Sequence, residues 1–176
     1  MSSDSESEHG GGVHVLVVDE DPGVLRNVCG RLLAHGYEVS TSRQARGLRE
    51  SIARLLPDLV LVDVLMPDLN GGELVRLLAQ YPASGTPAIV LHSAVPVRAL
   101  SRVVDIRGAL GVVKKTSDDV EFFLAFDSVL DRFRARKPGL DERPMRAMSG
   151  THRIGEDATP MLPENIAHST GDTWRR

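Results

Sequence analysis

The chain has 176 residues, enough for one domain of common size with an appendage but too few for two well-cored domains. Hydrophobic residues make up 41% of the sequence and aromatic ones only 4%, which predicts an aliphatic core of the kind found in buried parallel sheets. A formal net charge of −3 provides no basic field for nucleic acid, so direct DNA binding is disfavoured.

The N-terminal segment, residues 1–12, reads "MSSDSESEHGGG" and is predicted to be disordered. It is not a signal peptide, because no basic start is followed by an apolar stretch. No apolar run approaches the roughly 20 residues of a membrane span. The single Cys29 cannot form an intramolecular disulfide. We therefore expect a soluble, cytoplasmic protein without a membrane partner.

Between residues 13 and 136, strand-like apolar runs alternate with segments of helical period. The predicted strands are Val13–Val18, Tyr37–Thr41, Asp58–Val64, Pro87–His92 and Ala109–Val113. The predicted helices are Gly23–Ala34, Arg43–Leu55, Gly72–Tyr81, Val97–Ile106 and Ser117–Arg134. This alternation predicts right-handed crossovers and one five-stranded parallel sheet with helices on both faces, a three-layer α/β fold. Residues 137–176 lose the periodicity and are predicted to be a disordered tail.

Polar side chains follow four of the five predicted strands. Asp19 and Glu20 follow the first strand, Asp63 ends the third, Ser93 the fourth and Lys115 the fifth. The carboxyl ends of parallel strands lie at one edge of the sheet, where ligands bind. Two carboxylates 4 Å apart repel each other by about 4 kcal/mol at an effective dielectric constant of 20, so such a cluster does not serve stability. Grouped oxygen ligands favour a hard divalent cation such as Mg²⁺, which can also bind a phosphoryl oxygen.

The segment from about residue 13 to 136 resembles a response-regulator receiver domain of two-component signalling, a CheY-like protein. The resemblance rests on four ordered motifs: "VVDED", "VDVLMPDLNG", "LHSA" and "KK". It implies a doubly wound, flavodoxin-like (βα)5 fold. The order and spacing of the motifs along the chain also resemble those of the family.

The resemblance assigns a role to each of the polar residues. Asp63 matches the phosphoacceptor, Ser93 the switch hydroxyl and Lys115 the invariant lysine. Asp19, Glu20, Asp63 and the backbone carbonyl of Leu65 match the Mg²⁺ ligands. A register error of one residue would put Lys114 in the place of Lys115.

The resemblance implies a response regulator, which accepts a phosphoryl group from a histidine kinase or phosphotransfer protein and catalyses only its own phosphorylation and autodephosphorylation. We expect it to be stand-alone and single-domain, because a tail of about 40 residues cannot build a core of its own. Output would pass through contact with a downstream protein, with a possible homodimer through helix 4, strand 5 and helix 5. Two residues depart from the family: Val112 replaces an aromatic residue and Thr116 replaces proline. We expect a site that accepts phosphate without the usual aromatic readout.

Four further residues near the candidate site also have an expected role. Asp21 before Pro22 is as well suited to cap the following helix as to bind a metal. His92 is interpreted as an ordinary strand residue. The apolar Leu65 and Val95, two positions after Asp63 and Ser93, predict slow hydrolysis of a phosphoaspartate because neither can orient water.

Two alternative functions remain. The chain could be a receiver-like interaction module that works without phosphorylation, for which Val112 and Thr116 are the evidence. Alternatively, "VVDEDPG" resembles the start of a haloacid-dehalogenase-type phosphatase, with Asp19 as nucleophile and Asp21 as acid/base. That interpretation leaves Asp63 without a role. It also needs a second acidic pair after a further strand, whereas Asp118 and Asp119 follow Lys115 by only three and four residues.

Overall fold

The computed structural model describes residues 12–96, 98–99 and 108–136. Its strands are β1 (His14–Val18), β2 (Glu38–Ser42), β3 (Leu59–Asp63), β4 (Ala88–Ser93) and β5 (Gly111–Lys114). Its helices are α1 (Pro22–Ala34), α2 (Leu48–Leu55), α3 (Gly71–Gln80) and α5 (Asp119–Arg136). The predicted helix over 97–106 lies outside the described residues except for 98 and 99, which are helical. The terminal segments 1–11 and 137–176 lie outside them as well.

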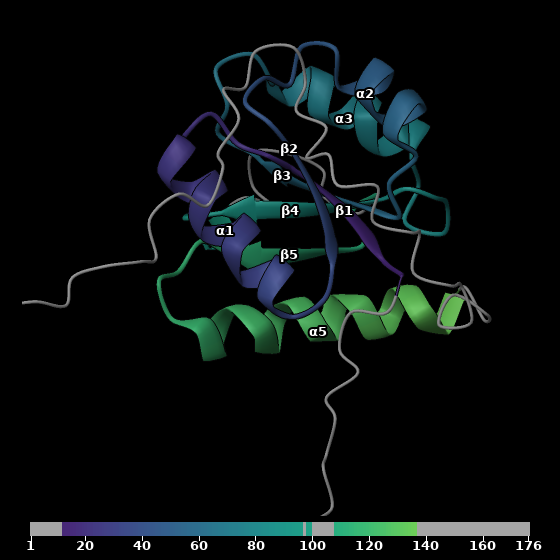
Figure 1. Cartoon of the computed structure of the whole chain (residues 1–176). Coiled ribbons are helices and arrows are strands. Elements are labelled where there is room, and N and C mark those ends of the chain that lie inside the picture. The colour runs from purple at the N-terminus through teal and green to yellow at the C-terminus, as the bar shows by residue number, and fades with distance from the viewer. Residues whose placement is uncertain (1–11, 97, 100–107, 137–176) are drawn as a thin grey trace, which may run out of the picture.

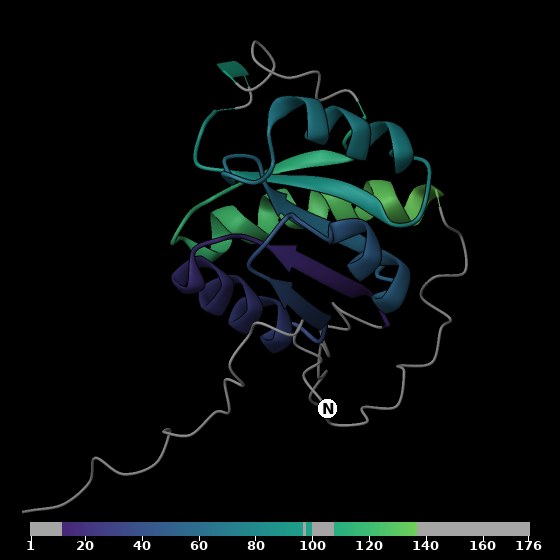
Figure 2. The ribbon, with the colours of Figure 1, turned by 90° about the horizontal axis from the view of Figure 1, so that it is seen from above.

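All five strands pair in parallel, in the order β2-β1-β3-β4-β5. Helices α1 and α5 cover one face of the sheet, and α2 and α3 cover the other (Figures 1 and 2). The central strand β3 is buried along its whole length, as a strand covered on both faces must be. This arrangement confirms the predicted doubly wound, flavodoxin-like, three-layer α/β fold. No helix in the described ranges is long and apolar enough to cross a membrane.

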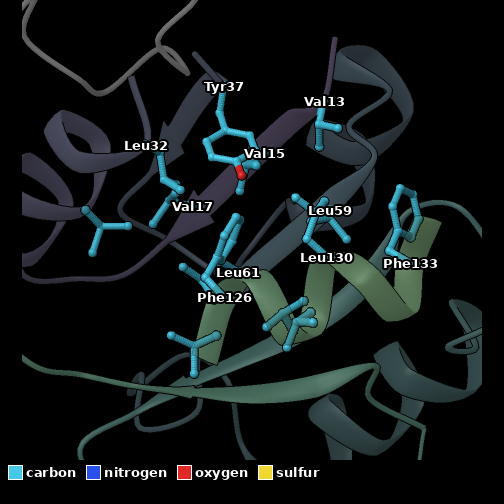
Figure 3. Close-up of a cluster of buried hydrophobic side chains, with 14 of the residues drawn as sticks. Val13, Val15, Val17, Leu32, Tyr37, Leu59, Leu61, Phe126, Leu130 and Phe133 are labelled. Atoms are coloured by element: carbon cyan, nitrogen blue, oxygen red, sulfur yellow. The ribbon is translucent and has the colours of Figure 1, made fainter. Parts of the chain in front are cut away.

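The two faces of the sheet differ in the side chains that fill them. All four phenylalanines of the chain belong to α5, and three of them, Phe122, Phe126 and Phe133, are buried against β1 and β3 together with Tyr37. Figure 3 shows Phe126 and Phe133 on this face. The buried residues of the opposite face are aliphatic apart from Met66. The aliphatic core expected from composition therefore describes the α2–α3 face only.

Helix α2 begins at Leu48, five residues later than Arg43, where the periodicity placed its start. Two local features explain the delay. Gly47 has a left-handed backbone with φ of 78°, which interrupts a right-handed helix. The Asp68 carboxylate accepts hydrogen bonds from the N–H groups of Ala45 (2.8 Å) and Arg46 (2.9 Å), so these residues join the β3–α3 loop instead.

The last strand is displaced relative to the prediction. β5 begins at Gly111, whereas the apolar run began at Ala109. A Cβ atom at position 111 would lie 2.6 Å from Val129 Cγ2 of α5, closer than real contacts allow. Glycine therefore lets β5 and α5 approach each other, and the strand continues to Lys114, which leaves Lys115 as the first residue beyond it.

Candidate functional site

Three charged side chains meet at the carboxyl edge of the sheet. Asp19 follows β1 directly, Asp63 is the last residue of β3 and Lys115 follows β5 directly. The Lys115 ammonium lies 2.7 Å from Asp19 Oδ2 and 2.9 Å from Asp63 Oδ2. One cation thus bridges two carboxylates that come from neighbouring strands.

Burial strengthens the electrostatic interactions among these three side chains. Asp19 is fully buried and Asp63 is 4% exposed, so water screens their charges poorly. Asp19 Oδ1 accepts a hydrogen bond from the Asp21 N–H (3.0 Å), and Asp63 Oδ1 accepts one from the Leu65 N–H (3.0 Å). Each carboxylate therefore uses one oxygen for its own loop and presents the other to Lys115.

The pKa values follow from the same contacts. Burial alone would raise the pKa of Asp19, but the neighbouring His92 ring, the Lys115 ammonium and the Asp21 N–H outweigh it and lower the pKa below 3.8. Burial alone would lower the pKa of Lys115, but Asp19 and Asp63 outweigh it and raise the pKa above 10.5. Asp19 and Lys115 are therefore both charged near neutral pH.

The two adjacent lysines have different surroundings. The Lys114 side chain is 62% exposed and forms an ion pair with Glu121 on α5 at 2.9 Å. The Lys115 side chain is 21% exposed and points to the carboxylates. Consecutive residues of a strand face opposite ways, so only one of the two could reach this edge. The structure places Lys115 there and Lys114 beside Glu121, a choice that the sequence left open.

Ser93 ends β4 and is fully buried at the same edge of the sheet. Its hydroxyl accepts a hydrogen bond from the Val95 N–H (3.0 Å), and its carbonyl accepts one from the Lys115 N–H (2.8 Å). The hydroxyl is thus engaged by its own loop and not by Asp63. Ser93 ties the backbone of Lys115 to β4.

The other predicted metal ligands lie at the rim. Glu20 is exposed, and the Leu65 side chain is 57% exposed. Asp21 caps α1, because its Oδ1 accepts a hydrogen bond from the Gly23 N–H (2.7 Å).

Within residues 12–96, 98–99 and 108–136, no group of three or more His, Cys, Asp or Glu is arranged to hold a metal ion. The oxygen donors at this edge have the chemistry that Mg²⁺ prefers, but the ammonium of Lys115 lies between the two buried carboxylates.

Sequence reasoning missed two polar residues near this edge. His92 is 1% exposed, and its Nδ1 lies 3.8 Å from Asp19 Oδ2, so the ring that was interpreted as an ordinary strand residue faces the carboxylate. Arg31 of α1 is also buried. Its position beside Leu32, on the apolar stripe of Leu25 and Val28, was the signal that could have identified it.

The comparison with protein families is decisive. The model of the response regulator receiver domain matches residues 15–127. The chain belongs to the response regulator receiver domain family. Receiver domains are generally signalling modules without enzymatic function, and response regulators interact with histidine kinases and downstream effectors. Membership in this family argues against the haloacid-dehalogenase alternative, in which Asp19 would be the nucleophile.

Two curated relatives are similar to this receiver domain over most of its length. The response regulator PleD of Caulobacter vibrioides is 35% identical over 142 residues, which cover 80% of this chain and 30% of PleD. The transcriptional regulatory protein GlrR of Escherichia coli is 32% identical over 133 residues, which cover 74% of this chain and 28% of GlrR. The chain spans less than a third of the length of these relatives.

Solved receiver structures share the fold. The chemotaxis response regulator CheY4 of Vibrio cholerae superposes with a TM-score of 0.58 at 22% identity, covering 67% of this chain and 98% of CheY4. The receiver domain of the response regulator NarL from Mycobacterium tuberculosis gives a TM-score of 0.56 at 25% identity, covering 70% of this chain and 98% of that domain. The exact domain limits of 13–136 stay a prediction.

Proposed function

We propose that this receiver domain accepts a phosphoryl group on Asp63 from a histidine kinase or phosphotransfer protein. The observation that carries the proposal is the Lys115 ammonium, which bridges Asp63 and Asp19 at 2.9 Å and 2.7 Å. The three residues come from three different strand ends, separated by 44 and 52 positions along the chain. A structural ion pair needs one carboxylate, whereas this site gathers two around a single cation.

In the proposed reaction, a carboxylate oxygen of Asp63 attacks phosphorus, and the P–N bond of a phosphohistidine breaks. The leaving imidazole nitrogen keeps the electron pair and takes up a proton. Lys115 would pair with the phosphoryl oxygens, which carry more charge as the bond breaks. The Ser93 hydroxyl would leave the Val95 N–H and donate a hydrogen bond to one of these oxygens, a shift between two arrangements of its loop.

We assign Mg²⁺ to Asp19, Glu20, Asp63 and the Leu65 carbonyl. Receiver domains generally bind Mg²⁺ at this acidic pocket. The bound ion would neutralise the carboxylates and the incoming phosphoryl oxygens. The chain's own residues do the rest: Asp63 supplies the nucleophilic oxygen, and Asp19 and Lys115 fix each other's position.

The output of the proposed signal passes through protein contact. The edge formed by β5 and α5, with the predicted fourth helix, is the surface that we expect a downstream protein or a second copy of the chain to bind. Most of that fourth helix lies outside the described residues. The net charge of −3 and the single Cys29 favour a cytoplasmic protein that does not itself bind nucleic acid.

Labelling by acetyl phosphate in the presence of Mg²⁺ tests the proposal. We expect one base-labile phosphoryl group per chain, detected by intact mass. Asp63→Asn should abolish it, and Asp19→Asn should retain it at a reduced rate. Asp58→Asn is the matched control, because Asp58 is a buried carboxylate at the opposite edge of the sheet, next to β3.

Three results would contradict the proposal. Label retained in Asp63→Asn would move the phosphoacceptor elsewhere, and label lost only in Asp19→Asn would restore the phosphatase chemistry. A folded wild-type protein that takes no label from acetyl phosphate or from any histidine kinase would favour the alternative of an interaction module that works without phosphorylation.

Once formed, the phosphoaspartate should hydrolyse slowly. The Leu65 side chain is 57% exposed beside Asp63, and Val95 follows Ser93 by two residues. Both are apolar, so neither offers an acid or amide to orient the attacking water. We expect a half-life of many minutes in Mg²⁺, measured by the decay of the labelled mass, and shorter in Leu65→Asn. A half-life of seconds in the wild type would contradict this expectation.

A further inference from the structure

Arg31 is a buried charge on the inner face of α1. Its side chain is 7% exposed, and it lies next to the fully buried Leu32. Taking a guanidinium out of water destabilises the fold unless its donors and its charge are satisfied. Its contacts therefore show what keeps this arginine inside.

All three guanidinium nitrogens have partners in the loop that follows β5 or at the start of α5. Nη1 donates to the Thr116 carbonyl at 2.8 Å, and Nη2 donates to the Ser117 carbonyl at 2.6 Å. Nε lies 2.7 Å from Asp119 Oδ1, and Cζ lies 5.3 Å from the centre of the Phe122 ring. The guanidinium thus holds the two carbonyls that come directly after Lys115.

The backbone of Lys115 is consequently fixed on both sides. Its own N–H donates to the Ser93 carbonyl at 2.8 Å, and the next two carbonyls are bound by Arg31. Position 116 is a threonine, whose backbone is freer than that of a proline. The Arg31 contacts restrict the loop at the point where the residue type alone would leave it mobile.

We propose that Arg31 is a positioning residue, which sets the place of the Lys115 ammonium by holding the Thr116 and Ser117 carbonyls. The role rests on the proposed function of Lys115 in phosphoryl transfer to Asp63. An arginine suits it better than a lysine, because one planar group must satisfy two carbonyls and a carboxylate at once. Arg31 itself touches neither Asp63 nor Asp19 in the described contacts.

A purely structural role makes different predictions. If Arg31 only stabilised the packing of α1 on α5, its loss would lower the free energy of unfolding and leave a folded site intact. If it positions Lys115, its loss lowers the maximal rate of labelling while the Mg²⁺ concentration for half-maximal labelling stays the same. The carboxylates assigned to the metal are not among its partners.

The test compares Arg31→Met with the wild type and with Asp119→Asn. Methionine keeps an unbranched stem beside Phe122 and removes all the donors. Asp119→Asn removes the charge of a partner that is 71% exposed and leaves both carbonyl bonds in place. We expect maximal labelling by acetyl phosphate to fall on the order of tenfold in Arg31→Met, as a displaced catalytic group requires, and to stay near wild type in Asp119→Asn.

Acylation of Lys115 by acetic anhydride gives a readout that needs no phosphorylation. Peptide mass spectrometry should show a several-fold faster reaction at Lys115 in Arg31→Met, while the exposed Lys114 reacts as in the wild type. If the wild type takes no phosphoryl label, the proposed function fails, yet the ratio of the two lysines still tests the position of Lys115.

Folding is checked by cooperative thermal unfolding. A folded Arg31→Met with the wild-type labelling rate and unchanged Lys115 acylation would overturn the inference. Where Arg31→Met does not fold, Arg31→Lys replaces it, because the charge is kept but one nitrogen cannot serve all three partners. Slower labelling with faster Lys115 acylation then supports the inference, and wild-type values in both overturn it.

Discussion

The two edges of the sheet both bury a carboxylate beside β3, but they satisfy it differently. At the amino edge, Asp58 accepts a hydrogen bond from the His14 N–H at 3.0 Å, and the His14 ring is 2.9 Å from Ser40 Oγ. At the carboxyl edge, Asp63 shares the Lys115 ammonium with Asp19. At the first edge the carboxylate accepts a hydrogen bond from a backbone N–H, whereas at the second edge two carboxylates share one ammonium.

The different surroundings of Asp58 and Asp63 indicate different roles for the two carboxylates. A carboxylate that accepts a backbone hydrogen bond contributes to stability and needs no further ligand. Two buried carboxylates that share one ammonium concentrate negative charge, which destabilises the metal-free fold and favours the binding of a cation. We therefore infer that Asp58 contributes to stability, whereas Asp63 serves the proposed phosphoryl transfer.

The largest expected effect belongs to Lys115. Lys115→Ala removes the charge proposed to pair with the phosphoryl oxygens, and we expect acetyl phosphate labelling of Asp63 to slow by roughly 10²-fold. Lys114→Ala is the matched control and should label at nearly the wild-type rate. Time courses of intact mass measure both. A slow Lys114→Ala beside a normal Lys115→Ala would reverse the assignment of the two lysines.

Mg²⁺ should stabilise the fold through the carboxyl edge of the sheet and not through the amino edge. At 100 times its Kd, the ion should add about 2.7 kcal/mol to the free energy of unfolding, because it binds only the folded chain. Urea denaturation with and without Mg²⁺ measures this gain. Asp63→Asn should lose most of it, and Asp58→Asn should keep it. Equal gains in the two variants would remove the carboxyl edge as the metal site.

Asp58→Ala should break the amino edge alone. It removes the acceptor of the part-buried His14 N–H, and we expect the free energy of unfolding to fall by about 2 kcal/mol. Asp58→Asn should lose less, because an amide oxygen still accepts. The labelling rate of Asp63 should not change in either variant, and a tenfold loss would show that the two edges are coupled.

The smallest expected effect is the dependence of the free energy of unfolding on pH in the acid range. The pKa of Asp19 in the folded chain lies below its usual 3.8. Its contribution to stability is therefore fully present above pH 3.8 and is lost as the pH falls through the lower folded value. In metal-free protein, Asp19→Asn should flatten the fall of the unfolding free energy below pH 3.8, which chemical denaturation at several pH values would show.

Local patterns predicted the elements better than their ends. Apolar runs and helical periods predicted all five strands and the four described helices. The start of α2 was wrong because it depends on Asp68, more than twenty residues away, and on the left-handed Gly47. The predicted start of β5 was wrong as well: the strand begins at Gly111, where the close approach of Val129 leaves no room for a Cβ atom. The hydrophobic periodicity of a segment carries no information about contacts with residues far away in the sequence.

The sequence likewise predicted some features of the candidate site and not others. The motif order predicted that Asp19, Asp63 and Lys115 meet, and they do. The burial of His92 against Asp19 could not be predicted, because it depends on which strands lie side by side. Arg31 reaches a carbonyl 85 residues further along the chain, so its contacts had no local signal.

The sequence by itself determined that polar side chains stand at the ends of buried strands, since hydrophobic alternation is a local property of the chain. It also determined the family, through residues 15–127. Only the tertiary structure decided that β1 and β3 are neighbours and that Lys115, not Lys114, bridges the carboxylates at their ends. It also decided that Arg31 holds the loop between β5 and α5. Strand order and loop anchoring depend on burying every face of the sheet at once, which no single segment encodes.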